Sequence, residues 1–139
     1  MSITYIVYLS YMTKNYTIEE MNELLDTYRR NNEIHGITGL MLYKDGNVIQ
    51  LIEGKEDDVL KLYNNISNDK THIHIIKLLH KQAENRMFSD WKMGFINYNK
   101  TTENLYGFST FLSKMKDDLC DDDKIVSLFK LFKHLNNNH

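Results

Sequence analysis

The feature that most constrains this chain is a pair of apolar runs joined by a short turn between residues 36 and 54. The first run covers residues 40–43 and the second covers residues 48–52, with Asp45-Gly46 between them. An Asp-Gly pair in this position predicts a β-hairpin, because the turn needs residues that tolerate positive φ. Gln50 lies inside the second run, where its neighbours on both sides look buried. A buried amide without hydrogen-bond partners costs about 1–3 kcal/mol, so we expect the rest of the chain to supply partners for Gln50.

Length, composition and charge indicate one soluble globular domain. The chain has 139 residues, of which 42% are apolar and 26% charged, and no apolar run approaches the ~20 residues that span a bilayer. The N-terminus lacks the basic segment and the cleavage site of a signal peptide, and the only cysteine is Cys120. We therefore expect a cytoplasmic protein without internal disulfides. A formal net charge of −2 disfavours a nucleic-acid partner.

A strand and a helix are expected before the hairpin. Residues 3–9 are rich in β-branched and aromatic side chains and alternate loosely, which predicts a strand. Thr17 followed by Glu20 has the pattern of a capping box, and apolar residues at helical spacing come after it. We expect this helix to end at residues that favour helix termini, namely Asn31, Asn32 and Gly36.

After the hairpin, the pattern predicts a second helix and two further strands. The helix covers residues 55–67, a strand covers 73–79, a polar loop covers 83–90 and a shorter strand covers 91–98. The resulting order, β-α-β-β-α-β-β, predicts an α+β, ferredoxin-like fold in which two helices pack on one face of an antiparallel sheet.

The C-terminal part of the chain is expected to cover the other face of the sheet. Apolar residues recur at helical spacing over 105–115 and again over 125–135, which predicts two helices. We therefore predict one compact unit, in which residues 1–98 form the sheet domain and residues 99–139 form a C-terminal helical cap.

Several short motifs coincide with this layout. They are Tyr8-Leu9-Ser10, Arg30-Asn31-Asn32, Gly36-Ile37-Thr38-Gly39, Gln50 within VIQLIEG, and Trp91-Lys92-Met93-Gly94-Phe95. Through them, residues 3–98 resemble the BLUF family, the blue-light sensors that bind flavin adenine dinucleotide (FAD). The C-terminal residues resemble the short cap of single-domain members, with no fused cyclase or phosphodiesterase. The resemblance implies a photoreceptor that is not an enzyme and that signals through protein–protein interaction.

The resemblance assigns the photochemistry to Tyr8 and Gln50. Tyr8 matches the family tyrosine that hydrogen-bonds the key glutamine and gives an electron and a proton to the excited flavin. Gln50 matches that glutamine, which bridges the tyrosine and the flavin N5/C4=O edge and changes orientation or tautomer after light. Strand parity agrees, because the faces that carry Tyr8 and Gln50 can both point toward the two helices. The resemblance places Trp91 and Met93 next in the route of the signal.

Other residues are expected to hold the flavin. The resemblance places Asn32 at the C4=O and N3–H edge of the ring and Asn31 on the rim of the pocket. Apolar side chains from the two helices, Leu24 or Leu25 and Ile66, are expected to sandwich the isoalloxazine ring. Asn65 stands where family members often have a basic residue near the phosphates, so possible substitutes are Arg29, Arg30 and Lys70. The ring pocket would accept FAD, flavin mononucleotide (FMN) or riboflavin.

Each of these residues also has an ordinary structural explanation. Tyr8, Trp91, Met93 and the apolar helix residues are typical of a core, and Gln50 is typical of a tolerated edge-strand amide. Four histidines, His35, His72, His74 and His80, follow no metal-ligand spacing, so we expect no metal site.

Two other classes of function suit a ferredoxin-like scaffold without flavin. A small acyl-phosphate hydrolase would need an anion-binding loop with a positioned arginine, and the start of the chain has none. An interaction module that binds RNA would need exposed aromatic residues and a basic patch on a sheet face, which the helical tail is expected to cover. For the light sensor we expect an unidentified downstream protein partner and a homo-oligomer, with neither nucleic acid nor membrane as partner.

Overall fold

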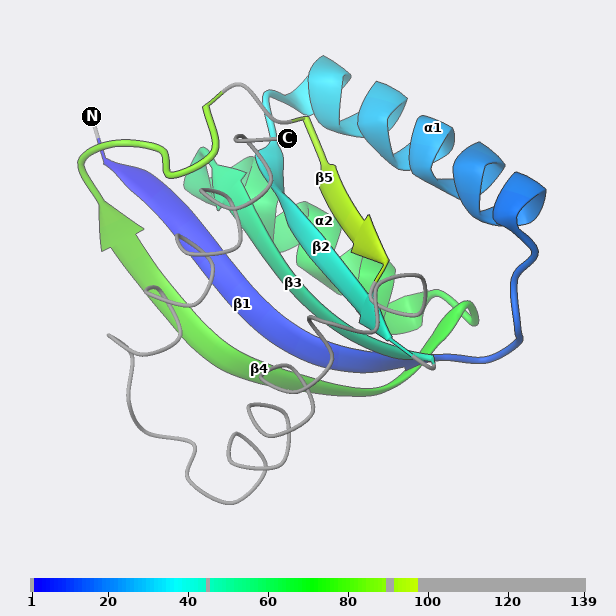
Figure 1. Cartoon of the computed structure of the whole chain (residues 1–139). Coiled ribbons are helices and arrows are strands. Elements are labelled where there is room, and N and C mark those ends of the chain that lie inside the picture. The colour runs from blue at the N-terminus through cyan, green and yellow to red at the C-terminus, as the bar shows by residue number, and fades with distance from the viewer. Residues whose placement is uncertain (1, 45, 90–91, 98–139) are drawn as a thin grey trace. The chain divides into compact units, whose positions relative to one another are not determined.

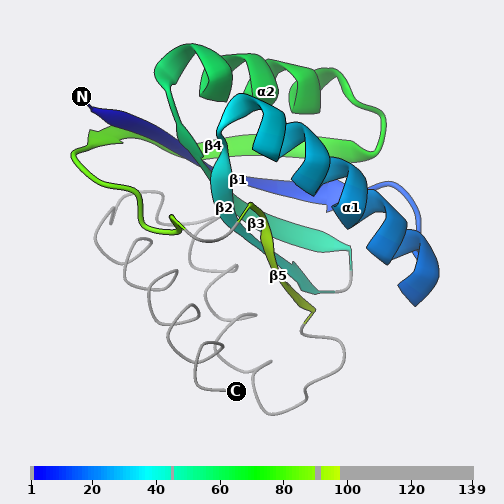
Figure 2. The same cartoon turned by 90° about the horizontal axis from the view of Figure 1, so that it is seen from above.

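The fold is a five-stranded sheet with two helices on one of its faces. The computed structural model describes residues 2–44, 46–89 and 92–97 (Figure 1). The strands are β1 (Ile3–Met12), β2 (Thr38–Lys44), β3 (Asn47–Gly54), β4 (His72–Ala83) and β5 (Gly94–Asn97), in the sheet order β4-β1-β3-β2-β5. The helices α1 (Ile18–His35) and α2 (Glu56–Asn68) lie on the same side of this sheet (Figure 2). The predicted α+β, ferredoxin-like order is confirmed.

The central hairpin forms as predicted. Strands β2 and β3 pair antiparallel, with Met41 opposite Gln50, and Gly46 in the turn has φ +83°. On its other side β3 pairs antiparallel with β1, where Tyr8 lies opposite Gln50. Gln50 therefore occupies the middle strand of the sheet, which makes the edge-strand explanation for this amide wrong.

The last strand differs from the prediction in its start and its direction. It begins at Gly94, not at residue 91, and it pairs in parallel with β2, so the sheet is mixed and not purely antiparallel. The direction follows from where the strands end: β4 ends, and β2 and β5 begin, at the same end of the sheet (Figure 1). Because β4 ends at the sheet end where β2 begins, the chain enters β5 from that same end.

Helix α1 is longer at its C-terminus than the sequence suggests. The capping box of Thr17 and Glu20 is confirmed, with both hydrogen bonds at 3.1 Å. Of the expected terminal residues, Gly36 closes the helix with φ +65°, whereas Asn31 and Asn32 lie within it, since the helix continues to His35. The side chain of Asn32 does not cap the helix but donates to the carbonyl of Lys92, 60 positions further along the chain.

The pairing of β1 with β4 is irregular on both sides of Tyr8. The register shifts once between Val7 and Tyr8 and again between Leu9 and Tyr11. In each case β4 contains one residue more than β1, and within the second shift His74 has φ +54°, a β-bulge conformation. Strand β4 therefore runs from residue 72 to 83, well beyond the predicted 73–79.

Alternation along the strands separates two apolar sets. The helix-facing set packs with Met21 and Leu25 of α1 and Val59 of α2, and includes Ile6, Tyr8, Met41, Val48 and Ile52. The opposite parity carries Val7, Leu40, Leu42, Ile49 and Leu51, all of which are fully buried. Gln50 belongs to the helix-facing parity, as the sequence predicts.

Chain contacts divide the protein into the units Met1–Lys100 and Thr101–His139. The sheet and both helices belong to the first unit, and the predicted C-terminal helices lie outside the described residues. In the described part of the chain, neither helix has the length and apolar character needed to cross a membrane.

Candidate functional site

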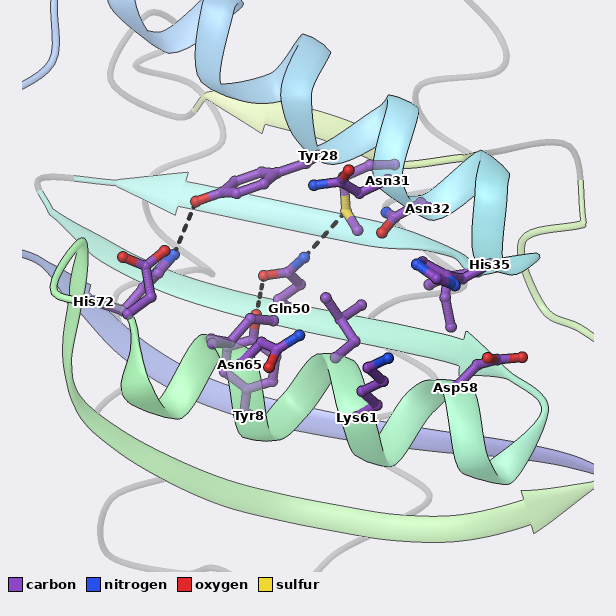
Figure 3. A pocket seen from close by; sticks show the side chains of 15 residues that line it. Tyr8, Tyr28, Asn31, Asn32, His35, Gln50, Asp58, Lys61, Asn65 and His72 are labelled. Atoms are coloured by element: carbon purple, nitrogen blue, oxygen red, sulfur yellow. Dashed lines mark hydrogen bonds between the residues drawn. The ribbon is translucent and has the colours of Figure 1, made fainter.

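A cavity of about 420 Å³ opens between α1 and α2 above the sheet (Figure 3). Its apolar lining comes from Ile37, Leu62 and Ile66. Its polar lining near the sheet comes from Tyr8, Gln50 and Asn32. Further polar side chains complete the wall, namely Tyr28, Asn31, His35, Asp58, Lys61, Asn65, Asp69 and His72. An apolar slot with convergent polar groups suits a flat aromatic ligand with a hydrogen-bonding edge.

The buried amide of Gln50 bonds to two side chains at the floor of this cavity. The hydroxyl of Tyr8 donates to Gln50 Oε1, and Gln50 Nε2 donates to the sulfur of Met93 at 3.3 Å (Figure 3). All three side chains are buried, with exposed fractions of 0% for Tyr8, 4% for Gln50 and 2% for Met93. A thioether is a weak acceptor, so the second of these bonds is the weaker one.

The amide of Gln50 is oriented with its oxygen toward the Tyr8 hydroxyl. Burial raises the pKa of Tyr8 well above its usual 10.0, and the neighbouring Tyr28 and Tyr63 raise it further. Tyr8 therefore keeps its hydroxyl proton and can donate it to the amide oxygen of Gln50. The edge of Tyr63 packs against Tyr8, with ring centroids 5.6 Å apart, and fixes the phenol from the α2 side.

Side chains of helix α1 hydrogen-bond the backbone at Lys92 and Met93. Asn32 Nδ2 donates to the Lys92 carbonyl at 2.7 Å, and Arg29 Nε donates to the Met93 carbonyl at 3.0 Å. Asn32 is 3% exposed and also lines the cavity, whereas Asn31 is exposed and lines its rim. One turn of α1 thus touches both the cavity and the backbone beside Met93.

A second set of hydrogen bonds joins Ser10, His72 and Tyr28, of which His72 and Tyr28 line the cavity. His72 Nδ1 lies 3.1 Å from Ser10 Oγ, and His72 Nε2 lies 3.1 Å from the Tyr28 hydroxyl (Figure 3). Burial lowers the pKa of His72, and the carboxylate of Asp69 opposes this effect. The sequence analysis did not predict these hydrogen bonds. Two signals were available: Ser10 lies on the same face of its strand as Tyr8, and Tyr28 lies one helical turn before Asn32.

The predicted ligand residues differ in where they lie. Ile66 lines the cavity as expected from helix α2, but Leu25 packs in the helix-facing core and Leu24 packs against that core. Arg29 faces the Met93 carbonyl, and neither Arg29, Arg30 nor Lys70 is among the lining residues. Lys61, which the sequence analysis did not select, supplies a lining ammonium group. Trp91 lies outside the described residues.

The predicted polar loop over residues 83–90 contains a buried anchor. Phe88 is fully buried, and its N–H donates to the carboxylate of Glu53 at 2.7 Å. Residues 84–89 form a loop as predicted, but Ala83 still belongs to β4 and Phe88 is buried. Glu53 itself is 1% exposed, so β3 carries a second buried polar residue besides Gln50. The sequence analysis missed it, although Glu53 directly follows the apolar residues Leu51 and Ile52.

The donor set of the cavity suits an organic ligand. Among the described residues there is no group of three histidine, cysteine, aspartate or glutamate side chains placed to hold a metal ion. The apolar walls and the buried amides of Gln50 and Asn32 instead match a ring whose faces are apolar and whose edge accepts and donates hydrogen bonds. An isoalloxazine ring has these properties, so the residues present fit a flavin.

Comparison with known proteins agrees with this geometry. The family profile described as "Sensors of blue-light using FAD" matches residues 3–94. The blue light- and temperature-regulated antirepressor BluF of Escherichia coli (strain K12) is 25% identical over 131 residues, which are 94% of this chain and 32% of that protein. The chain thus spans about a third of this relative's length, and about a tenth of a photoactivated adenylate cyclase subunit beta of Euglena gracilis, which is 35% identical over 91 residues.

Solved structures show the same fold. The dark-state structure of BlrB, a BLUF protein, superimposes with a TM-score of 0.75 at 22% identity and covers 93% of both chains. A bacterial light-regulated adenylyl cyclase matches with a TM-score of 0.73 at 30% identity, over 83% of this chain and 34% of the cyclase chain. Cavity, hydrogen-bond network and family profile lead to one conclusion: the chain belongs to the BLUF family, the sensors of blue light that use FAD.

Proposed function

We propose that the Tyr8–Gln50–Met93 network is the light-operated switch of this blue-light sensor. The observation that carries the proposal is the unequal bonding of Gln50, which accepts from a phenol on one side and donates to a thioether on the other. A switch needs two arrangements of similar free energy, and an amide can present either its oxygen or its nitrogen to Tyr8. Bound flavin supplies the absorption of blue light and takes up an electron and a proton.

The residues of the switch act in a fixed order. In the dark, Tyr8 holds its proton and donates to Gln50 Oε1. After excitation Tyr8 loses an electron and its hydroxyl proton, so the hydrogen bond that fixes the Gln50 oxygen is lost and the amide reorients or changes tautomer. When the electron and the proton return, Tyr8 is restored but Gln50 keeps its new arrangement. The contact from Gln50 to Met93 is then changed, and this is the signal.

We propose FAD as the cofactor, with FMN and riboflavin as alternatives for the same ring site. Ile66 and Leu62 of α2 and Ile37 would flank the ring, while Gln50 and Asn32 would bond its edge. Lys61 and Asn65 lie on the same helix and line the cavity, so they would face the ribityl and phosphate groups. This assignment replaces Arg29, Arg30 and Lys70 as phosphate ligands, because these three do not line the cavity.

We propose that the protein passes its signal to another protein and has no catalytic activity of its own. Support comes from the E. coli relative, which is named as an antirepressor. Further support comes from BlrB, a BLUF protein that matches over 93% of both chains, whereas the light-regulated cyclase extends far beyond the matched part. We further propose that the protein self-associates into a homo-oligomer. Its single cysteine supports a cytoplasmic location. For residues 99–139 we propose a helical cap over the apolar sheet face that carries Leu40 and Leu42.

An absorption spectrum of the purified protein in the dark, during blue light and afterwards tests the proposed switch. We expect a flavin band that shifts slightly to the red in light and returns in the dark. A flavin band that bleaches without shifting would indicate flavin reduction, and would contradict the switch. Absence of any band, even after flavin is added, would leave a colourless interaction module as the function.

A further inference from the structure

A buried carboxylate lies on the same strand as Gln50 but outside the cavity. Glu53 accepts three hydrogen bonds, from the backbone N–H of Met87 at 2.8 Å, from the N–H of Phe88 at 2.7 Å and from the Thr38 hydroxyl at 3.0 Å. Thr38 is the residue directly opposite Glu53 in the pairing of β2 with β3. The carboxylate therefore joins two strands of the sheet to the connection that follows β4.

Arg86 completes this arrangement. Its Nη1 atom donates to Thr38 Oγ1 at 3.0 Å and lies 3.3 Å from the backbone carbonyl of Glu53. We name the set formed by Thr38, Glu53, Arg86 and the N–H groups of Met87 and Phe88 the Glu53 clamp. Hydrogen bonds to an ionised group are about twice as strong as neutral ones, so the clamp is a firm attachment.

The clamp holds one end of a chain segment whose other end is bonded by Asn32 and Arg29 of α1 and by Gln50. The segment starts at Arg86, where the clamp lies, and ends at Met93, whose sulfur accepts from Gln50. Gln50 and Glu53 are three residues apart on β3, with side chains on opposite faces of the sheet. Strand β3 therefore bonds the segment near both of its ends. Gln50 donates to the weak acceptor Met93 Sδ, and the Glu53 carboxylate accepts from the N–H groups of Met87 and Phe88.

We infer that Glu53 is a positioning residue that holds Met93 beside Gln50 in the dark, and so sets the rate of return from the lit state. The inference rests on the proposed switch. If the clamp loosens, Met93 is less firmly placed to accept from Gln50, the dark arrangement is less stabilised and the return becomes slower. Glu53 acts without touching the flavin cavity, so the size of the red shift stays unchanged.

The decisive experiment is a double-mutant cycle on the dark recovery rate of the full chain loaded with FAD. Glu53→Gln keeps one oxygen acceptor but directs an NH₂ group toward backbone N–H donors. We expect it to slow recovery about threefold, the size of a weak hydrogen bond. In a Met93→Leu background the same change should have no further effect, because the residue through which Glu53 acts is gone. The exposed Glu23→Gln is the matched control and should recover like the wild type.

A second readout reports on Met93 itself. The ε-methyl signal of Met93 in a methionine-labelled sample, assigned through Met93→Leu, should shift or broaden in dark Glu53→Gln and stay unchanged in Glu23→Gln. An unchanged Met93 signal with wild-type recovery would overturn the inference, as would slowing of equal size in the Met93→Leu background. A wild-type protein without any red shift would refute the switch instead, and the dark Met93 signal would still test the positioning.

The wild-type protein offers a test that needs no variant to fold. Coupling between two sites is reciprocal, so a clamp that favours the dark position of Met93 must itself be favoured by that position. Illumination should therefore speed amide hydrogen exchange at Met87 and Phe88, whose N–H groups bond Glu53. Equal exchange in the dark and in continuous light would contradict the inference. Arg86→Met, which removes only the outer part of the clamp, should slow recovery in the same direction and by less.

Discussion

Gln50 and Glu53 are both buried polar residues on β3, but they are bonded in opposite ways. Gln50 is a neutral amide with one firm partner, Tyr8, and one weak partner, Met93. Glu53 accepts three hydrogen bonds of 2.7–3.0 Å and is 1% exposed. Under the proposed switch, one strand carries a group that moves on one face and a group that stays fixed on the other. The number and strength of hydrogen-bond partners, not burial, separates them.

The strongest test of this comparison removes the movable group. Gln50→Leu has similar bulk but can neither accept from Tyr8 nor donate to Met93. We expect the variant to bind flavin and to lose the light-induced red shift completely, which dark and lit absorption spectra will show. Tyr8→Phe should give the same result from the other side of the hydrogen bond. A retained red shift in Gln50→Leu would remove Gln50 from the switch.

Removing the fixed group should act on stability. Glu53→Ala leaves the buried N–H of Met87 and of Phe88 without their acceptor, and each such loss costs about 1–3 kcal/mol. We expect the free energy of unfolding in urea to fall by about 3 kcal/mol. Glu23→Ala, at an exposed position of α1, is the control and should lie near the wild type. A wild-type midpoint for Glu53→Ala would mean that Glu53 is not a firm anchor.

The weak side of Gln50 can be weakened further. Met93→Leu removes only the thioether acceptor and keeps an apolar side chain of similar size. We expect the red shift to remain and the dark recovery to slow by about threefold, since a single weak hydrogen bond is lost from the dark arrangement. Time-resolved absorption after a blue flash measures both. Complete loss of the red shift would show that the thioether is as essential as Tyr8.

The smallest effect is expected from a second fixed group, His72, which bonds Ser10 and Tyr28. Burial lowers the pKa of His72 in the folded state below its usual 6.5, although Asp69 beside it acts in the opposite direction. Below that pH the unfolded chain binds more protons than the folded one, so the free energy of unfolding should fall as pH falls through 6.5. Urea unfolding at pH 7.5 and pH 5 should show this difference, and His72→Gln should reduce it. The exposed His80→Gln should leave it as in the wild type.

Local patterns were sufficient to predict much of the fold. The Asp-Gly turn predicted the hairpin, Thr17 and Glu20 predicted the start of α1, and parity placed Tyr8 and Gln50 toward the helices. These features depend on residues close in sequence, whose backbone preferences and alternation can be read directly. The flavin site between the helices was expected from the resemblance to the BLUF family, which placed Ile66 and Leu24 or Leu25 on either side of the ring.

Long-range bonds decided what the sequence could not show. The side chain of Asn32 does not cap the helix, because it donates to the Lys92 carbonyl instead. Helix α1 places Tyr28 and Asn32 at the cavity and Leu25 in the core. Phe88 is buried inside a polar stretch because Glu53, 35 positions earlier, bonds its N–H. The direction of β5 likewise follows from the path of the whole connection. These partners are far apart in the sequence, so patterns of neighbouring residues could not predict them.

The bulge at His74 has a consequence for how these molecules behave at high concentration. Strand β4 forms one edge of the sheet and exposes Ile73 and Ile76, with exposed fractions of 40% and 43%. A long, regular edge with apolar side chains is a template on which another chain can add a strand and begin to aggregate. The φ of +54° at His74 breaks the ladder between these two isoleucines, and Lys77 follows immediately. By the same principle, the irregular edge disfavours the addition of a strand from a neighbouring molecule.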